Sequence, residues 1–364
     1  MPENADKSIG RRSRFHGLVN TSSDRRPMIH AYVPRNGTVD RLEVAGHIPI
    51  PGNALWFDLF EPTADERLRL EAALGLQLPS REEMQEIEPS SRLYTEGDAS
   101  YMTATIMAHA DAPFPTAESF TFILARRCLV TLRYQDPRPI ALYAQRLMKS
   151  PGVRLSGEEV LIGLIEAFVD RIADILEKVA LDLDAQARLV FTPPTAGGVR
   201  TAKSAVDLQE VMRALGRNED LATSARESLL SLNRMVRFLA TIVEGVPAAD
   251  PVAKKEQRDQ KQRVKTLVRD MMSLGEHAAF ELAKVNFLLD ATLGVINIEQ
   301  TQIIKLFSVA AVMLMPPTLI ASIYGMNFKS IPELQWDFGY PLAILVMVLS
   351  AVVPYLWFKR KGWF

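Results

Sequence analysis

The residues best suited to ion chemistry lie near the end of this 364-residue chain, in the run Tyr324-Gly325-Met326-Asn327. Gly325 allows a helix to end or backbones to approach closely, and Asn327 then presents a side-chain carboxamide oxygen. Rotational symmetry between several copies would turn that oxygen into a ring of neutral acceptors. Because Mg²⁺ releases its bound waters reluctantly, such a ring suits hydrogen bonds to the hydrated ion better than direct coordination.

A stripe of small polar and unbranched side chains precedes that run. Its members recur every seventh residue: Thr301, Ser308, Met315 and Ser322. Thr318 lies beside them, and we call this set the seven-residue stripe after its spacing. Such spacing keeps side chains near one face of a helix. Hydroxyl groups there suit the lining of an ion path, but small residues also let membrane helices pack closely. The stripe alone supports both interpretations equally.

These residues lie on the first of two segments that are long enough to cross a bilayer. Residues 306–325 and 340–358 contain no charged side chain, and each matches the roughly 20 apolar residues of a membrane-spanning helix. Core helices of soluble proteins rarely run this long without a charge, so we expect a membrane hairpin. Its connection, residues 326–339, carries the acidic residues Glu333 and Asp337.

Basic residues beside the two segments predict the orientation of the hairpin. Lys305 precedes the first segment, the tail at residues 359–364 begins with Lys-Arg-Lys, and Lys329 is the only basic residue of the connection. Because basic residues favour the cytoplasmic side, we expect both chain ends in the cytoplasm and the connection outside. Two helices cannot enclose a water-filled path, so ion transport would require several copies around an axis.

The chain upstream divides into a tail, an α+β domain and a helical region. Residues 1–27 contain five arginines among small polar residues and are predicted to be disordered. Residues 28–150 combine strand-like runs with a helix that opens on a capping box, in which Thr63 is followed three residues later by Glu66. This mixture favours an α+β fold. Hydrophobic residues then recur with a helical period over 151–305 and predict helices at 157–190, 205–243 and from 252 onwards.

The last of these helices has no strong break before residue 324. About 70 residues at 1.5 Å each would make it about 105 Å long. Such a helix would leave the soluble part and continue into the bilayer as the first span. It would transmit a regulatory movement if the assembly has two discrete arrangements. A plain coiled-coil anchor fits the same pattern.

Composition and missing motifs argue against other classes of protein. The net charge is −1 and charges of both signs are interspersed, so no nucleic-acid partner is expected. Cys128 is the single cysteine, in an apolar run with a turn predicted at Arg126-Arg127, and a buried thiol is expected there. The five histidines form no ligand-spaced pair and no phosphate-binding loop occurs. We therefore expect neither an enzyme nor an organic cofactor.

Together these residues resemble the CorA family of magnesium channels, which is marked by Gly-Met-Asn at the end of the first of two C-terminal spans. Trp56-Phe57-Asp58-Leu59 resembles the family's soluble domain more weakly, whereas Pro332-Glu333-Leu334 favours the magnesium branch over the related zinc transporters. Motifs similar in type and order cover about the last 80 residues: Asn297-Ile298-Glu299-Gln300, Pro316-Pro317-Thr318, Tyr324-Gly325-Met326-Asn327-Phe328, Gly339-Tyr340-Pro341 and the terminal Lys-Arg-Lys-Gly-Trp-Phe.

The resemblance implies a funnel-shaped homopentamer in the inner (plasma) membrane. Each subunit would have an α+β cytoplasmic domain, long stalk helices and a two-helix transmembrane hairpin whose first span lines the pore. It also implies uptake of Mg²⁺, with Co²⁺ and Ni²⁺ as secondary ions, gated by intracellular Mg²⁺. Acidic sites between cytoplasmic domains would sense Mg²⁺, but no motif fixes which carboxylates form them.

The resemblance further implies roles along the path. Asn327, with Gly325 and Met326, would form the selectivity filter and bind Mg²⁺ through its hydration shell. Thr301 would face the cytoplasmic entrance, and Asp290 would form a wider acidic ring. The pore between filter and entrance would be lined or constricted by four residues: Phe307, Met315, Thr318 and Ser322.

Two positions depart from the family pattern. Thr301 stands where many members have Asn, and Lys329 stands where an acidic residue is common. Attraction of cations by the external loop should therefore depend on Glu333 and Asp337. A divalent ion entering at about −100 mV gains about 4.6 kcal/mol, so the membrane potential can drive uptake unaided. The alternatives are Zn²⁺ or Co²⁺/Ni²⁺ as the main cargo, and a non-conducting membrane-anchored sensor.

Overall fold

A computed structural model describes residues 29–35, 37–46, 48–112, 115–126, 128–149, 155–192, 202–245, 251–327 and 336–362. The tail predicted to be disordered, residues 1–27, lies outside these ranges. Residues 328–335 of the connection, with Lys329 and Glu333, also lie outside them.

The chain divides into two compact units. One unit contains the described residues up to Met102, together with Phe120–Asp136 and Ala144–Leu161. The other contains Thr103–Ser119, Pro137–Tyr143 and the chain from Ile162 to its end.

The N-terminal fold is built on a seven-stranded mixed sheet with the strand order β2-β1-β3-β7-β6-β5-β4. Strands β3 and β7 pair in parallel, whereas β1 pairs with β2 and β3, β4 with β5, and β6 with β7 in antiparallel fashion. The strands are β1 Ile29–Arg35, β2 Thr38–Glu43, β3 Trp56–Phe60, β4 Leu93–Glu96, β5 Ala99–Ala108, β6 Thr116–Ala125 and β7 Cys128–Arg133. The helices of this part are α1 Ala64–Leu74, α2 Arg81–Met84, α3 Pro89–Arg92 and α4 Arg138–Lys149.

Local sequence signals set several of these boundaries as predicted. The capping box opens α1, because the Thr63 amide donates to Glu66 Oε2 at 2.9 Å and the Glu66 amide donates to Thr63 Oγ1 at 3.3 Å. A hairpin turn separates β6 from β7 at the predicted position, with Arg126 at a positive φ of 58°. The Cys128 thiol is half-buried rather than buried and donates to the Ala125 carbonyl at 3.3 Å.

A buried ion pair joins the two parallel strands at the centre of the sheet. Arg133 Nε and Nη2 each donate to a different oxygen of Asp58 at 2.9 Å, and the Thr131 hydroxyl donates to Asp58 Oδ1 at 2.7 Å. Burial opposes the charge of Arg133, but the attraction of Asp58 outweighs it and raises the pKa of the guanidinium. Trp56 Nε1 donates to the Thr131 hydroxyl at 2.9 Å and extends the network. This network fixes the pairing of β3 with β7.

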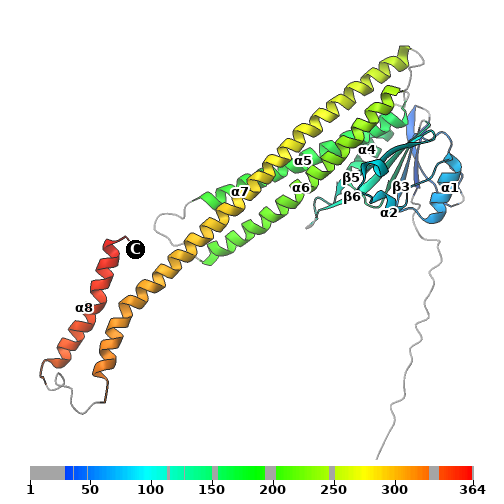
Figure 1. The fold of residues 1–364 in the computed structure, drawn as a ribbon. Helices are drawn as coiled ribbons and strands as arrows, with labels where there is room; N and C mark the ends of the chain where they lie inside the picture. The colour runs from blue at the N-terminus through cyan, green and yellow to red at the C-terminus, as the bar shows by residue number, and fades with distance from the viewer. Residues whose placement is uncertain are drawn as a thin grey trace, which may run out of the picture. The chain divides into compact units, whose positions relative to one another are not determined.

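The residues described after α4 contain four long helices: α5 Gly157–Phe191, α6 Ala202–Gly245, α7 Pro251–Tyr324 and α8 Gly339–Arg360. The predicted unbroken helix is confirmed, since α7 has 74 residues and a length of about 111 Å. Figure 1 shows α7 as one continuous ribbon beside α6. Arg263 holds α7 to α5 through a two-point contact with Glu166, at 2.8 and 2.7 Å. Lys284 Nζ adds a contact with Asp184 Oδ1 at 2.6 Å.

The close packing of Gly157 generates a test of this fold. A Cβ atom at Gly157 would lie 2.7 Å from the carbonyl carbon of Cys128 and 2.8 Å from the Leu129 nitrogen. Because these are backbone atoms of β7, Gly157→Ala should lower the free energy of unfolding by about 1–3 kcal/mol. Gly275→Ala in α7 is the matched control, since nothing lies within 4 Å of its Cβ. That variant should gain about 1 kcal/mol. Thermal unfolding of the full chain in detergent measures the stability of both variants. Equal melting temperatures would contradict the close packing of Gly157 against the backbone of β7.

Candidate ion pathway along helix α7

Hydroxyl groups on α7 use their protons within the helix. Thr301 Oγ1 donates to the Asn297 carbonyl at 2.8 Å, Ser308 Oγ to the Ile304 carbonyl at 2.8 Å, and Thr318 Oγ1 to the Leu314 carbonyl at 2.7 Å. All three side chains are exposed. Because each proton is committed to the backbone, the hydroxyl oxygen presents lone pairs to its surroundings. These oxygens are therefore suited to accept hydrogen bonds from water bound to an ion.

Helix α8 covers one face of α7 and leaves the seven-residue stripe uncovered. The two helices are in contact, and the covered side of α7 is marked by Val309, which is buried, and by half-buried residues at three- and four-residue steps: Met313, Pro316 and Ile320. Every residue of the stripe is exposed, and Met315 has 68% of its surface free. A helix turns by about 100° per residue, so Met315 points about 120° away from Val309. The stripe remains available to another copy or to water.

The other predicted pathway residues follow in order along the same helix. Asp290 is exposed about 17 Å before Thr301. Phe307 is 70% exposed, directly precedes Ser308 and lies about 12 Å before Met315 along the axis, so the two apolar side chains flank the Ser308 hydroxyl. Thr318 and Ser322 are exposed beyond them. In chain order the exposed side chains are thus an acid, a hydroxyl, two apolar groups with the Ser308 hydroxyl between them, and again hydroxyls.

Helix α7 ends immediately before the Gly-Met-Asn run. The Gly325 amide donates to the Ala321 carbonyl at 2.9 Å, and a Cβ at Gly325 would lie 3.2 Å from that same oxygen. The Met326 amide donates to the Ile323 carbonyl at 3.2 Å, which tightens the last turn. Asn327 follows outside the helix with an exposed side chain, and Asp337 is exposed just before α8. Glu333 lies outside the described residues.

Two prolines within α7 leave two backbone carbonyls of the helix without their usual donors. Pro316 and Pro317 lie inside α7 and have no amide hydrogen. The carbonyls of Val312 and Met313 therefore lose their usual donors four residues later. In a bilayer such carbonyls require another partner, which a neighbouring helix or water supplies. The proline pair was the signal in the sequence for these free acceptors.

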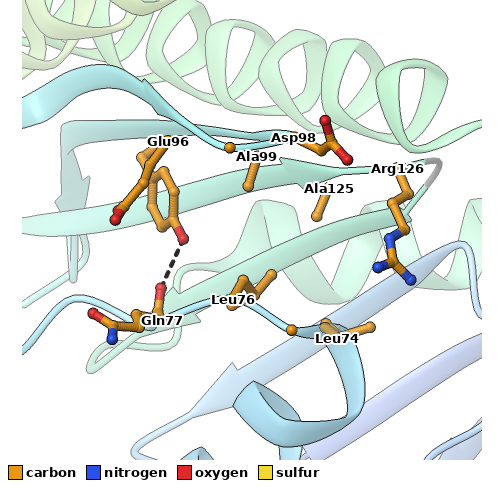
Figure 2. A pocket seen from close by; sticks show the side chains of 11 residues that line it. Leu74, Leu76, Gln77, Glu96, Asp98, Ala99, Ala125 and Arg126 are labelled. Carbon is orange, nitrogen blue, oxygen red and sulfur yellow. Dashed lines mark hydrogen bonds between the residues drawn. The ribbon is translucent and has the colours of Figure 1, made fainter.

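The soluble part has a cavity of about 440 Å³ that is unrelated to the predicted pathway. Figure 2 shows Glu96 near one end of its lining and Arg126 near the other, with the Tyr101 hydroxyl donating to the Gln77 carbonyl at 2.9 Å. Among the described residues no group of three or more His, Cys, Asp or Glu side chains is arranged to hold a metal ion. The carboxylates that would sense Mg²⁺ stay unassigned.

The fold and the helix α7 define a class of protein. Both α7 and α8 contain apolar segments long enough to cross a membrane, and within that segment α7 carries three exposed hydroxyl side chains, Ser308, Thr318 and Ser322. These are the features of a two-span membrane protein that handles ions. The family model described as CorA-like Mg²⁺ transporter protein matches residues 52–360. The chain belongs to this CorA family of magnesium transporters.

Relatives from two organisms agree with this assignment. The chain is 35% identical to the magnesium transport protein CorA of Escherichia coli strain K12 over 336 residues, which is 92% of this chain and 100% of that protein. It is 34% identical to the magnesium transport protein CorA of Salmonella typhimurium, with the same coverage.

Solved structures show the same fold at low sequence identity. The complete CorA magnesium transporter of Methanocaldococcus jannaschii matches with a TM-score of 0.68 and 16% identity, over 93% of this chain and 99% of that chain. The full-length CmaX protein matches with a TM-score of 0.59 and 17% identity, over 94% and 100% of the two chains. The ZntB cytoplasmic domain of Vibrio parahaemolyticus matches with a TM-score of 0.51 and 15% identity, over 75% and 99%.

The exposure of Met315 generates a test of the pathway. Met315 is predicted to constrict the path, so Met315→Asp should raise ion leak severalfold in liposomes while the protein still assembles. Met313 lies two residues away and is half-buried on the face toward α8. Met313→Asp should instead lower the yield of folded protein, because it buries an unpaired charge where α7 packs against α8. A Met315→Asp variant that shows no increase in ion leak would indicate that this side chain packs against protein rather than lining the pathway.

Proposed function

We propose that the chain forms a homopentameric channel of the inner (plasma) membrane that takes up hydrated Mg²⁺, with Co²⁺ and Ni²⁺ as secondary ions. The observation that carries the proposal is the uncovered stripe on α7. Each subunit contributes two spans, which cannot enclose a water-filled path. Copies arranged around an axis with their stripes inward would enclose one, with the α8 helices outside.

Selectivity arises at the external mouth in this proposal. Gly325 and Met326 end the helix, so that Asn327 from each copy contributes a neutral oxygen to one ring. Neutral acceptors bind the waters of the hydrated ion without removing them. A ring of carboxylates would hold the ion more tightly and slow its release. Glu333 and Asp337 raise the local cation concentration outside the ring.

The rest of the path follows α7 toward the cytoplasm. Ser322 and Thr318 offer hydroxyl oxygens below the filter, and Met315 and Phe307 form the apolar constriction that dewets when closed. Thr301 lies at the cytoplasmic entrance. Asp290 then forms a wider acidic ring within the soluble stalk.

The membrane potential drives uptake, and intracellular Mg²⁺ closes the path. Lys305 and the basic tail after α8 support an orientation with both termini in the cytoplasm. Because α7 runs unbroken from the soluble bundle into the span, ion binding in the cytoplasm would act on the pore through one rigid element. The channel requires no organic cofactor and catalyses no reaction.

Purified protein in liposomes under a negative-inside potential tests this function. Mg²⁺ should enter, and entry should fall when Mg²⁺ is present inside. Cobalt hexaammine should block it, because that ion resembles hydrated Mg²⁺ and cannot lose its ligands. Preferential entry of Zn²⁺ would shift the assignment to a zinc transporter of the same architecture. No entry of any ion by correctly assembled protein would favour a non-conducting sensor.

Asn327→Ala in the same assay isolates the filter. It should abolish selective Mg²⁺ entry while leaving assembly intact, because it removes an exposed acceptor and no packing. Asn233→Ala is the matched control, since it removes a carboxamide from α6 whose oxygen accepts from Arg237 Nε at 2.9 Å. That control should conduct normally. Unchanged Mg²⁺ selectivity in Asn327→Ala would refute the assignment of Asn327 to the selectivity filter.

A further inference from the structure

The cavity of the soluble part lies where three connections of the chain meet. These are the segment that follows α1, the turn between β4 and β5, and the turn between β6 and β7. We call this space of about 440 Å³ the turn cavity. All of its lining residues belong to one of the two compact units, so the cavity is formed within that unit.

The walls of the turn cavity are tied together by the protein itself. The Tyr101 hydroxyl of β5 donates to the Gln77 carbonyl at 2.9 Å, and the Tyr101 ring stacks on the Tyr94 ring with 4.7 Å between centroids. The Glu71 carboxylate holds the segment after α1, because it accepts from the Leu78 amide at 2.8 Å. A site that is formed in advance requires little ordering when a ligand binds.

Apolar side chains form the middle of the turn cavity. Figure 2 shows Leu74 and Leu76 on one side of it and Ala99 and Ala125 on the other. The two alanines belong to the buried core of the sheet, with 6% and 7% of their surface exposed. This middle part suits a hydrocarbon segment, whose transfer out of water is favourable.

Charged side chains of opposite sign lie at the two ends of the cavity. Glu96 is near one end and Arg126 is near the other (Figure 2). Strand β5 separates β4, which ends at Glu96, from β6, which ends just before Arg126, so the two turns are about 10 Å apart across the sheet. Both side chains are exposed, and neither makes a hydrogen bond or an ion pair with any described residue.

The charges of the lining restrict the chemistry of a ligand. Asp98 lies in the same turn as Glu96, so the described lining carries two negative charges and one positive charge. A phosphate ester would meet this excess of negative charge. A lone cation would leave Arg126 without a partner and the apolar middle unfilled. A molecule with a cationic group at one end and a carboxylate at the other complements both ends.

We propose that the turn cavity binds a small zwitterion in which a hydrocarbon segment joins an ammonium group to a carboxylate, as in an ω-amino acid. The ammonium group binds at Glu96, the hydrocarbon segment lies between the leucines and the alanines, and the carboxylate binds at Arg126. The extended length of 6-aminohexanoate, about 8 Å from standard bond lengths, is comparable with the separation of the two turns. The proposal does not depend on the proposed function, because the cavity lies outside the predicted pathway.

Isothermal titration calorimetry of the full chain in detergent tests the proposal with 6-aminohexanoate as the probe. Binding should be saturable, with a dissociation constant of about 1 mM or lower for a ligand of about nine heavy atoms. Hexanoate and hexylamine each keep one of the two charges and should bind at least about fivefold more weakly. The absence of saturable binding of 6-aminohexanoate, or equal binding of either singly charged compound, would overturn the proposal.

Substitutions at the two ends test where the probe binds. Glu96→Gln should weaken binding of 6-aminohexanoate at least about fivefold and leave binding of hexanoate unchanged. Arg126→Gly should have the same effect on 6-aminohexanoate and leave binding of hexylamine unchanged. Because Arg126 has a positive φ of 58°, glycine suits this turn and the variant should fold. Arg126→Gln, which keeps a polar side chain, should repeat the result.

A carboxylate outside the cavity provides the matched control. Glu219 is exposed on α6, and Glu219→Gln should bind 6-aminohexanoate as the unaltered chain does. Unchanged affinity in both Glu96→Gln and Arg126→Gly would show that the probe binds elsewhere and would refute the site. An equal loss of affinity in Glu219→Gln and Glu96→Gln would refute it too, since binding would then follow only the net charge of the protein.

Discussion

In the hydrocarbon of a bilayer a polar group finds no water, and this constraint governs the design of α7. The hydroxyl protons of Ser308 and Thr318 bond to carbonyls of their own helix, so these residues are polar at low cost. The lone pairs of these hydroxyl oxygens stay exposed on the surface of the helix. A helix that satisfies itself in this way can offer acceptors to a hydrated cation without exposing unpaired donors that would repel it.

The two ends of α7 are covered on one side only. In the soluble part the bundle covers α7 along the face of Val285, and in the span α8 covers the face of Val309. Between these two coverings one face stays open from Phe280 to Ser322. The chemistry changes along that face, from aromatic to hydroxyl to thioether, while its exposure does not. The proposed assembly depends on this open face.

Local signals predicted much of the fold, because capping boxes, turns and helical periods depend on neighbouring residues. The opening of α1 at Thr63, the turn at Arg126 and the unbroken course of α7 are all confirmed. Strands β2 and β4 were not predicted. The parallel pairing of β3 with β7 was not predicted either, because the Asp58–Arg133 pair that accompanies it joins positions 75 residues apart. For the candidate pathway, the order of the residues along α7 follows from the sequence, and their role as pathway residues stays a prediction. The sequence could not show which face α8 covers, because α8 is apolar all round and has no period to read.

The continuity of α7 also restricts how this protein can vary through evolution. One residue added between Phe287 and Thr301 would turn everything beyond it by about 100° and carry it about 1.5 Å along the axis. The exposed phenylalanine and the hydroxyl groups of the stripe would then face different directions, although each segment still formed a sound helix. Only length changes close to a whole number of turns, such as about seven, eleven or eighteen residues, would keep the two segments facing the same way, whereas an inserted residue in the loops between the long helices would not turn them relative to each other.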